Sequence, residues 1–411
     1  MRADAWLRET GFMPDEAALR RVEDGLIAAM EAGLDGRGGL PMLPAYVSAP
    51  EVKRARRAIV LDAGGTHLRA ALMQVTPDGR AQVILQRVIP TPGTQGRISA
   101  EAFFDEIAAL IAPMCGDSGC IGFCFSFACE ILPDRDARVL YLDKELQVDG
   151  LAGCLVAEGL RGALAARGLR SDHRITVLND TVAAQLGASG EVGMILGTGF
   201  NCCYGEANGR IRKDAALCER PGRTIVNTEC GAFDALPLTA ADFAVHAATA
   251  DGASNALEKT LSGAYQGLLL ASLMRGAAEA GVLRIGHIPE IGAKDITALL
   301  LDPGASGLLR DCSPDWAAVT DLARGVIDRA AAFTAATLHA ILRKGDLGLH
   351  APAGIAAEGS TFWRNPFLRE EIIRRLQTTG RDFRIVSTPE ANLAGAAMAA
   401  LSDEGGTPCL P

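Results

Sequence analysis

The sequence predicts an α/β protein that folds as two lobes. Short apolar runs alternate along the chain with amphipathic stretches, and pairs of apolar runs meet at glycine-rich turns. Strands that alternate with helices in this way are typical of layered α/β folds. The chain has 411 residues, of which 49% are hydrophobic. Because single cores stop growing beyond about 250–300 residues, we expect two of them.

The individual elements follow from the spacing of apolar residues. Residues 14–34 repeat apolar side chains every three or four positions, which predicts an amphipathic helix with Pro14 in its first turn. Apolar runs over 58–61 and 68–75 meet at Gly64-Gly65 and predict a β-hairpin. We expect further strands at 120–127, 175–178, 192–196, 201–206 and 354–357, and helices at 101–111, 151–166, 181–187, through most of 239–344, and after 357.

Composition and charge exclude several classes of protein. A net charge of −9 disfavours binding to nucleic acid or to anionic membranes, since both need a basic excess. No apolar stretch approaches the roughly 18 residues of a membrane span, and the N-terminus does not resemble a secretory signal. The 11 cysteines lack paired C-x-x-C spacing, so we expect reduced, mostly buried thiols and no cysteine metal site. These features predict a cytoplasmic protein.

The first motif that can carry chemistry is Asp62-Ala63-Gly64-Gly65-Thr66. Two glycines at a hairpin tip let backbone N–H groups approach a phosphate closely, and Thr66 adds a hydroxyl donor. Asp62, at the end of the preceding strand, can hold a water molecule bound to Mg²⁺. A plain hairpin turn explains the same residues, so the motif alone does not decide.

The second motif is Asn179-Asp180, placed where a predicted strand passes into a helix. An aspartate at such a junction can accept a proton from an attacking hydroxyl group, as a general base. The same position also suits an aspartate that caps the N-terminus of the helix. Both explanations of Asp180 remain open from this motif alone.

Three weaker signals complete the set. Gly197-Thr198-Gly199, followed by Asn201, is a second glycine turn without Walker A or Rossmann spacing. Glu229 and Glu258 supply carboxylates, which accept hydrogen bonds from paired hydroxyl groups and therefore suit a polyol ligand. An exposed helical salt bridge is the alternative explanation for Glu258.

Taken in order, these motifs resemble those of the hexokinase family, in its eukaryotic-type hexokinase and glucokinase group. The resemblance begins at 40–47 and covers most of the chain. It rests on the Gly-Gly-Thr turn, Ser126-Phe127, Asn179-Asp180, Gly197-Thr198-Gly199, Asn227-Thr228-Glu229, Glu258-Lys259 and Glu358-Gly359-Ser360.

The resemblance implies a two-lobed actin-like ATPase (ribonuclease H-like) fold with an active-site cleft between a small and a large domain. It places the small domain at 54–178 and the large domain at 1–53 and 179–393. The C-terminal helix, about 394–411, is expected to join the small domain. The implied reaction uses ATP and Mg²⁺ to phosphorylate the 6-hydroxyl of a hexose (D-glucose, with mannose and fructose also open), in a monomer or homodimer.

The resemblance also assigns roles to individual residues. Asp180 would be the general base. The hexose would be bound by Ser126, Lys144, Asn179, Asn201, Glu229 and Glu258. Gly64, Gly65, Thr66 and Thr198 would hold the phosphates, Asp62 would lie near the metal, and Gly359 and Ser360 would lie against the adenosine. No direct protein ligand of the metal is expected.

Some positions depart from the family pattern. His67 replaces a usual Asn, Asp143 a usual Thr beside Lys144, and Cys230 a usual Trp, while 389–395 replaces a glycine-rich stretch. These changes bear on sugar preference and nucleotide affinity more than on the chemistry. Two functions of other classes remain possible: a sugar-sensing regulator without turnover, and an actin-like filament ATPase.

Overall fold

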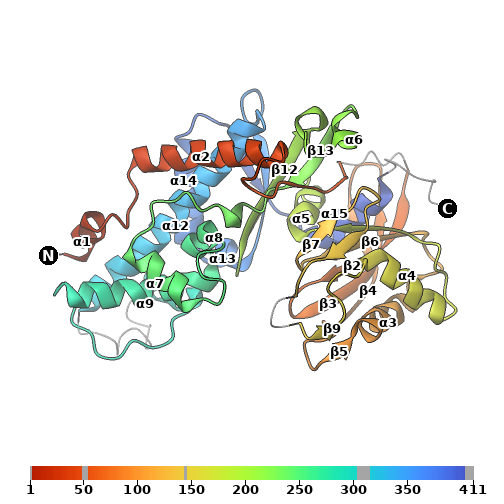
Figure 1. The fold of residues 1–411 in the computed structure, drawn as a ribbon, viewed down its shortest axis with the longest axis horizontal. Helices are drawn as coiled ribbons and strands as arrows, with labels where there is room; N and C mark the ends of the chain where they lie inside the picture. The colour runs from red at the N-terminus through yellow and green to blue at the C-terminus, as the bar shows by residue number, and fades with distance from the viewer. Residues whose placement is uncertain (1, 49–53, 143–145, 303–314, 403–411) are drawn as a thin grey trace.

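Two β-sheets organise the protein. The computed structural model describes residues 2–48, 54–142, 146–302 and 315–402. One sheet has six strands in the order β1-β13-β12-β11-β14-β15, and the other has five in the order β10-β6-β2-β3-β4. Figure 1 shows them in two lobes, and most of the helices lie with the six-stranded sheet.

The five-stranded sheet is built on the predicted hairpin. β2 (Arg56–Ala63) pairs antiparallel with β3 (His67–Val75), and β6 (Cys120–Phe125) and β10 (Arg174–Leu178) continue the sheet in parallel. β4 (Ala81–Pro90), which the sequence analysis missed, forms the outer edge. The expected helices are α3 (Ala100–Ile111) and α4 (Val156–Ala166).

The six-stranded sheet contains the second predicted hairpin, β11 (Val192–Leu196) with β12 (Phe200–Ala207), and the predicted strand β14 (Ala353–Glu358). β1 (Leu43–Pro44), β13 (Arg223–Asn227) and β15 (Phe383–Val386) were not predicted. The helices of this lobe are α2 (Glu16–Leu34), α7 (Ala240–Ala248), α8 (Ala256–Leu261), α9 (Gly263–Glu279), α10 (Ala293–Leu301), α12 (Trp316–Lys344), α13 (Ser360–Arg364) and α14 (Pro366–Gln377).

The start of α2 corrects one expectation. The helix begins at Glu16, and the carboxylate of Asp15 accepts a hydrogen bond from Ala18 N at 2.7 Å. Asp15 is thus the N-cap, and Pro14 precedes the helix instead of lying in its first turn.

The remaining short elements are α1 (Ala3–Glu9), β5 (Ile98–Ser99), β7 (Cys129–Ile131), β8 (Ala137–Val139), β9 (Val148–Asp149), α6 (Ala215–Cys218), and the 3₁₀ turns η1 (Ala112–Met114), η2 (Asn208–Arg210) and η3 (Cys230–Ala232).

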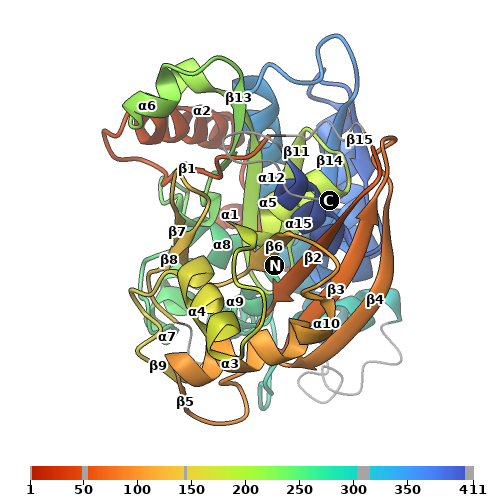
Figure 2. The ribbon, with the colours of Figure 1, turned by 90° about the vertical axis from the view of Figure 1, so that its right-hand side faces the viewer.

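Two helices, α5 (Asp180–Gly187) and α15 (Ala391–Leu401), lie between the sheets in Figure 1 and next to each other near the centre of Figure 2. α5 packs on β11, β12 and β14, while α15 packs on β2, β6 and β10, and the two helices pack on each other. A Cβ added at Gly187 would lie 1.9 Å from Ala391 O, and one at Gly395 would lie 1.8 Å from Ala183 O. Glycine at these positions therefore allows direct contact between the two helix backbones.

The packing of α15 also bears on the domain division. This helix comes near the end of the chain, yet it packs on the five-stranded sheet. A Cβ added at Gly122 of β6 would lie 2.0 Å from Ala396 O. α15 thus lies against the five-stranded sheet. The division into a small domain at 54–178, joined by the C-terminal helix from about 394, and a large domain stays a prediction.

The cysteines follow the expectation with one exception. Eight are free thiols: Cys115, Cys124, Cys129, Cys154, Cys202, Cys203, Cys218 and Cys230. Cys120 is disulfide-bonded, so the prediction of reduced thiols is wrong there. Sequence spacing does not report which cysteines the fold brings together. Within the described ranges, His, Cys, Asp and Glu form no group of three or more suited to a metal, and none of the helices is long and apolar enough to cross a membrane.

We predict that Gly395→Ala destabilises the protein by about 3 kcal/mol or more, because the added methyl group would overlap the backbone of α5. Gly162→Ala is the matched control. Gly162 is an exposed helical glycine of α4 whose added Cβ would contact nothing within 4 Å, so the control should gain about 0.5–1 kcal/mol. Urea unfolding of both variants measures this difference. Equal small effects would show that α5 and α15 are not in such close contact.

Candidate functional site

The parallel strands of the five-stranded sheet bring three of the predicted site segments to one edge. Asp62 of β2 and Leu178 of β10 both pair with Cys124 of β6, the strand between them. The residues that follow each strand therefore lie side by side, as expected for the carboxyl ends of parallel strands. Ser126 N donates to Ala63 O at 3.2 Å, which fixes the turn after β6 beside the turn after β2. Asp62, Ser126 and Asn179-Asp180 thus share this edge.

The start of α5 separates the two explanations of Asp180. Asn179 is the N-cap, and its Oδ1 accepts a hydrogen bond from Thr181 N at 2.9 Å. The N-cap explanation is therefore wrong for Asp180, which is the first residue of the helix. Asp180 Oδ1 accepts from Thr181 N at 2.8 Å, while its Oδ2 receives no hydrogen bond from the described residues. One carboxylate oxygen thus remains available to a ligand.

The surroundings of Asp180 change its acidity. Burial raises the pKa of Asp180 to about 6, the hydrogen bond from Thr181 N opposes this, and the negative charges of Glu229 and Asp62 raise the pKa further. Part of the side chain is accessible, but protein surrounds the carboxylate on most sides. A carboxylate with a pKa close to neutral is suited to take up and release a proton.

The six-stranded sheet supplies a polar network next to this carboxylate. Asn201 Nδ2 donates to Asn227 Oδ1 at 2.7 Å, and Asn227 Nδ2 donates to Glu229 Oε1 at 2.7 Å. Glu229 follows β13 with a left-handed φ of 52°. Burial raises its pKa, and the hydrogen bonds from Asn227 and Asn201 oppose that rise. Asn227 belongs to the Asn227-Thr228-Glu229 motif but is not among the predicted site residues, because its pairing depends on the register of β12 and β13.

Glu258 joins the site from α8. Its Oε2 accepts a hydrogen bond from Phe200 N at 2.8 Å, and a Cβ added at Gly199 would lie 2.7 Å from the same oxygen. Lys259 instead donates to Asp251 Oδ1 at 2.6 Å and is almost completely buried. An exposed helical salt bridge is therefore ruled out for Glu258, because its side chain is only partly exposed and forms no ion pair with the described residues. Burial raises the pKa of Glu258.

The second glycine turn lies where β11 and β14 end in parallel. Gly197 O accepts hydrogen bonds from Gly263 N and from Thr361 Oγ1, both at 2.8 Å. Gly359 has a φ of 106°, and a Cβ there would lie 2.3 Å from Leu196 O. Glycine at 359 is thus required by the close approach of the two turns. Thr198 and Ser360 remain exposed beside them.

Hydrogen bonds hold one side of the first glycine turn, and its other side is exposed. Thr91 Oγ1 donates to Gly64 O at 2.6 Å, and Gly64 N donates to His67 O at 3.2 Å. A Cβ added at Gly64 would approach nothing closer than His67 O at 3.7 Å, while Gly65 and Thr66 are exposed. The protein's own packing therefore does not require glycine at 64, which leaves the free face of the turn for a ligand.

Arg69 is a further site residue that the sequence analysis did not select. Its Nε donates to Asp62 Oδ2 at 3.0 Å and its Nη1 donates to Glu390 Oε2 at 2.5 Å. The three side chains connect β2, β3 and the residue before α15, and Glu390 has a left-handed φ of 57°. Beside them is a cavity of about 530 Å³ lined by Arg69, Glu358, Trp363 and residues 387–392. This cavity adjoins Gly359 and Ser360.

Lys144 and Asp143 lie outside the described residues. The role of Lys144 in binding the hexose therefore stays a prediction. The other predicted residues fall into two groups. Asp180, Ser126, Asn179, Asn201, Glu229 and Glu258 form one group, and Asp62, Gly64, Gly65, Thr66, Thr198, Gly359 and Ser360 lie at the turns around it. A magnesium ion carried by phosphates needs few protein ligands, since it keeps several waters. Asp62 is the one acid at the first glycine turn and fits such a water-mediated role.

We predict that Asp180→Asn stabilises the folded protein at pH 8 but not at pH 4. The folded pKa of about 6 exceeds the ordinary 3.8, so the stabilisation from the protonated acid is complete below pH 3.8 and is lost as the pH rises through 6. Two pKa units correspond to about 3 kcal/mol, which the amide variant regains at pH 8. Denaturant unfolding at both pH values measures the difference.

Asp105→Asn is the control of opposite sign. The ion pair with Arg167 lowers the pKa of the exposed Asp105, so its substitution should destabilise slightly at pH 8 and have no effect at low pH. An Asp180→Asn gain of equal size at pH 4 and pH 8 would contradict the raised pKa.

Comparisons with known proteins agree over most of the chain. Two models of the hexokinase family match, one over residues 8–189 and the other over residues 191–402. The chain is 32% identical to the chloroplastic hexokinase-4 of rice over 69% of this chain and 59% of that protein. It is 27% identical to hexokinase-2 of the rat over 90% of this chain and 45% of that protein. The chain thus spans about 30–64% of the length of the first relatives it matches.

Solved structures show the same fold. Hexokinase from Schistosoma mansoni, in complex with glucose, has a TM-score of 0.79 at 22% identity and covers 97% of this chain and 99% of its own. A second hexokinase crystal structure has a TM-score of 0.75 at 24% identity, over 93% of this chain and 94% of its own. At these identities the likeness establishes the two-lobed fold. Together with the family models, which match both halves of the sequence, it shows that the chain belongs to the hexokinase family.

Proposed function

We propose that this protein transfers the terminal phosphoryl group of ATP to the 6-hydroxyl of a hexose, with D-glucose as the first candidate and mannose and fructose as others. The observation that carries the proposal is the Asp180 carboxylate, with a pKa of about 6 and one oxygen that receives no hydrogen bond from the described residues. It lies between a group of polyol-binding side chains and two glycine turns.

The sugar would be held through its hydroxyl groups. Glu229 and Glu258 accept hydrogen bonds from hydroxyls, and Asn201, Asn179 and Ser126 can both donate and accept. The negative charges of the Glu229 and Glu258 carboxylates would repel an anionic substrate, so a neutral polyol is favoured. This arrangement would orient one hydroxyl toward the free oxygen of Asp180.

Asp180 would accept the proton of the attacking 6-hydroxyl as the oxygen begins to bond to phosphorus. Phosphoryl transfer leaves little covalent work to the protein, so positioning and charge stabilisation account for most of the catalysis. Proton removal by a placed base typically contributes about 10²–10⁴-fold. Excluding water from the site would prevent transfer of the phosphoryl group to solvent.

The phosphates would lie between the two glycine turns. Backbone N–H groups at Gly65 and Thr66, with the Thr198 hydroxyl, would donate to phosphate oxygens, and Gly64 would let the phosphates approach the turn closely. Mg²⁺, bound with the nucleotide, would neutralise phosphate charge, and Asp62 would hold one of its waters. The cavity at Trp363, next to Gly359 and Ser360, is where the adenosine would lie.

The family relatives support the class of reaction and leave its details to experiment. The structure from Schistosoma mansoni was solved with glucose, which favours that sugar as the first to test. The cytoplasmic location stays a prediction, as relatives from rice and tobacco are chloroplastic. We also propose that the protein is a monomer or a homodimer and that its small domain comprises residues 54–178.

We predict measurable turnover of glucose in a coupled assay with ATP and Mg²⁺, run against a panel of mannose, fructose, galactose and N-acetylglucosamine. Asp180→Ala should lower kcat by about 10²–10⁴-fold while glucose still binds, because the base acts mainly in the transition state. Glucose binding is followed separately by its shift of the melting temperature.

Glu229→Ala is the companion variant. It removes an acceptor for sugar hydroxyls and should raise KM for the sugar far more than KM for ATP. Retention of near-normal kcat by Asp180→Ala would show that another group is the base. Binding of glucose without turnover of any sugar by the unaltered protein would favour the sugar-sensing regulator.

A further inference from the structure

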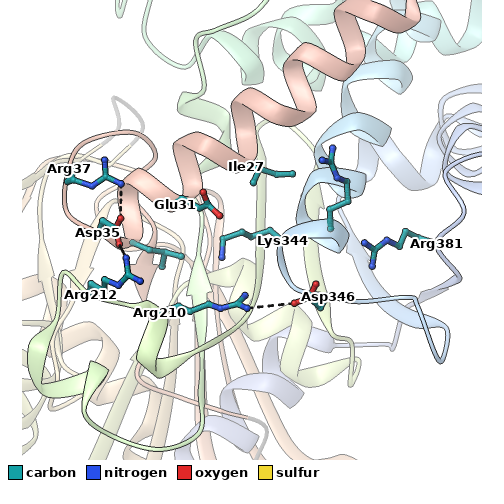
Figure 3. Close-up of a pocket in the computed structure, with 11 residues that line it drawn as sticks. Ile27, Glu31, Asp35, Arg37, Arg210, Arg212, Lys344, Asp346 and Arg381 are labelled. Atoms are coloured by element: carbon teal, nitrogen blue, oxygen red, sulfur yellow. Dashed lines mark hydrogen bonds and ion pairs between the residues drawn. The ribbon is translucent and has the colours of Figure 1, made fainter.

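A second polar cavity lies away from the candidate active site, in the lobe of the six-stranded sheet. Its volume is about 630 Å³, and its walls come from the C-terminal ends of α2 and α12, the turn η2, and the loop before β15 (Figure 3). Asn201, in the candidate site, is near the start of β12, whereas η2 follows the end of that strand. The cavity is therefore at the far end of β12 from the sugar-binding group.

The cavity is unusually rich in cations for a chain with a net charge of −9. Six basic residues line it: Arg37, Arg210, Arg212, Arg343, Lys344 and Arg381. Three acidic residues line it as well: Glu31, Asp35 and Asp346. Acidic side chains of the protein neutralise some of these six cations and not others.

Three of the arginines have close acidic partners. Asp35 accepts from Arg37 at 2.7 Å and from Arg212 at 3.2 Å. Arg343 pairs with Asp24 at 3.0 Å and with Glu23 at 3.4 Å, both on the side of α2. These three guanidinium groups are held by the protein itself and have little left to offer a ligand.

Arg210 and Arg381 are different. The nearest acidic oxygens to Arg210 belong to Glu206 and Asp346, both at 3.8 Å, which is too long for a hydrogen bond. Arg381 donates to the backbone oxygen of Leu347 at 2.9 Å and forms no ion pair with any described residue. Both guanidinium groups therefore have N–H donors that form no hydrogen bond with an acidic group of the described residues. Figure 3 shows them on opposite sides of the cavity, with their ends toward its interior.

Lys344 adds a fixed charge between them. Its side chain is 6% exposed, and its ammonium donates to Glu206 Oε2 at 2.8 Å. An ammonium has three hydrogens, so further donors remain. Glu206 is itself 1% exposed and already accepts from Tyr204 Oη at 2.8 Å, which fixes this acid below the cavity. Glu31, on α2, forms no ion pair with the described residues, and Asp346 lies 3.8 Å from Arg210, so these two acids would oppose an anion here.

We infer that this cavity binds a small phosphate-bearing anion. Guanidinium groups donate in pairs to phosphate oxygens, and such charge-assisted bonds are about twice as strong as neutral ones. Arg210 and Arg381 supply this geometry from two sides, and Lys344 supplies a third donor from within. Inorganic phosphate and phosphate monoesters share the chemistry, and a site of this volume accepts either.

The test follows the melting temperature of the full chain in potassium phosphate and in potassium chloride at matched ionic strength. Phosphate is expected to stabilise the protein more than chloride. The double variant Arg210→Ala/Arg381→Ala should weaken phosphate binding at least about tenfold, since it removes two charge-assisted partners. Arg212→Ala is the matched control, because Arg212 is already held by Asp35 and its loss should change binding by less than about twofold.

Glu31→Gln tests whether a negative charge in the cavity opposes binding of the anion. Removing this carboxylate should tighten phosphate binding several-fold, because a like charge near the anion is lost. Circular dichroism of each variant checks that it is folded, and if the double variant is not, the Glu31→Gln result decides. Equal stabilisation by chloride, an unchanged affinity in a folded double variant, or weaker binding by Glu31→Gln would overturn the inference.

A second arm separates the two sources of the anion. Glycerol 3-phosphate is titrated beside inorganic phosphate, with free glycerol as the blank. Tighter binding of the ester, lost in the double variant, assigns the site to phosphate monoesters. Equal affinities, also lost in the double variant, assign it to the phosphate group alone. If neither anion's affinity responds to the variants, the cavity is not an anion site.

Discussion

The direct contact between α5 and α15 is the constraint on which the rest of the structure depends. Each helix packs on a different sheet, so their contact sets how the two sheets are placed. Glycines at 187 and 395 remove the side chains that would otherwise separate the two backbones. Asp180 begins α5 and Glu390 precedes α15, so the same contact fixes the proposed base relative to the proposed nucleotide cavity.

Three carboxylates near this contact are stabilised in three different ways. Asp62 is paired with Arg69, and Glu229 accepts hydrogen bonds from two asparagines. Asp180 has only the hydrogen bonds of Thr181 and lies near the other two acids. Asp180, the least stabilised of the three, has a pKa raised to about 6. The reactivity proposed for Asp180 and its cost in stability have the same physical origin.

The sequence predicted those parts of the fold that follow from local patterns. Local signals such as apolar periodicity and glycine turns were enough to predict several elements correctly. These are both hairpins, the helices at 101–111 and 181–187, and the strand at 175–178. β4 was missed because much of it is exposed, so its apolar residues have no alternating pattern to report burial. β13 and β15 are short strands whose place depends on pairing with distant segments.

The candidate site divides in the same way. The order of motifs was enough to place Asp180, Glu229 and Glu258 in one group, through a resemblance to known proteins. It could not give the partners of each acid, because those come from other strands. Arg69 beside Asp62, Asn227 beside Glu229 and Phe200 N beside Glu258 all depend on tertiary contact. Capping by Asn179 instead of Asp180 depends on the exact first residue of a helix, which sequence patterns do not fix.

The central claim is that Asp180 acts as a base whose pKa is raised by burial and by its acidic neighbours. The most direct measurement is the pH dependence of kcat/KM for the sugar, which reports groups of the free enzyme. The account predicts that kcat/KM falls with a one-proton slope below a pH of about 6. In Glu229→Gln the inflection should move to lower pH, since a negative neighbour is removed. A flat profile through this range, or an inflection that moves to higher pH in the variant, would contradict it.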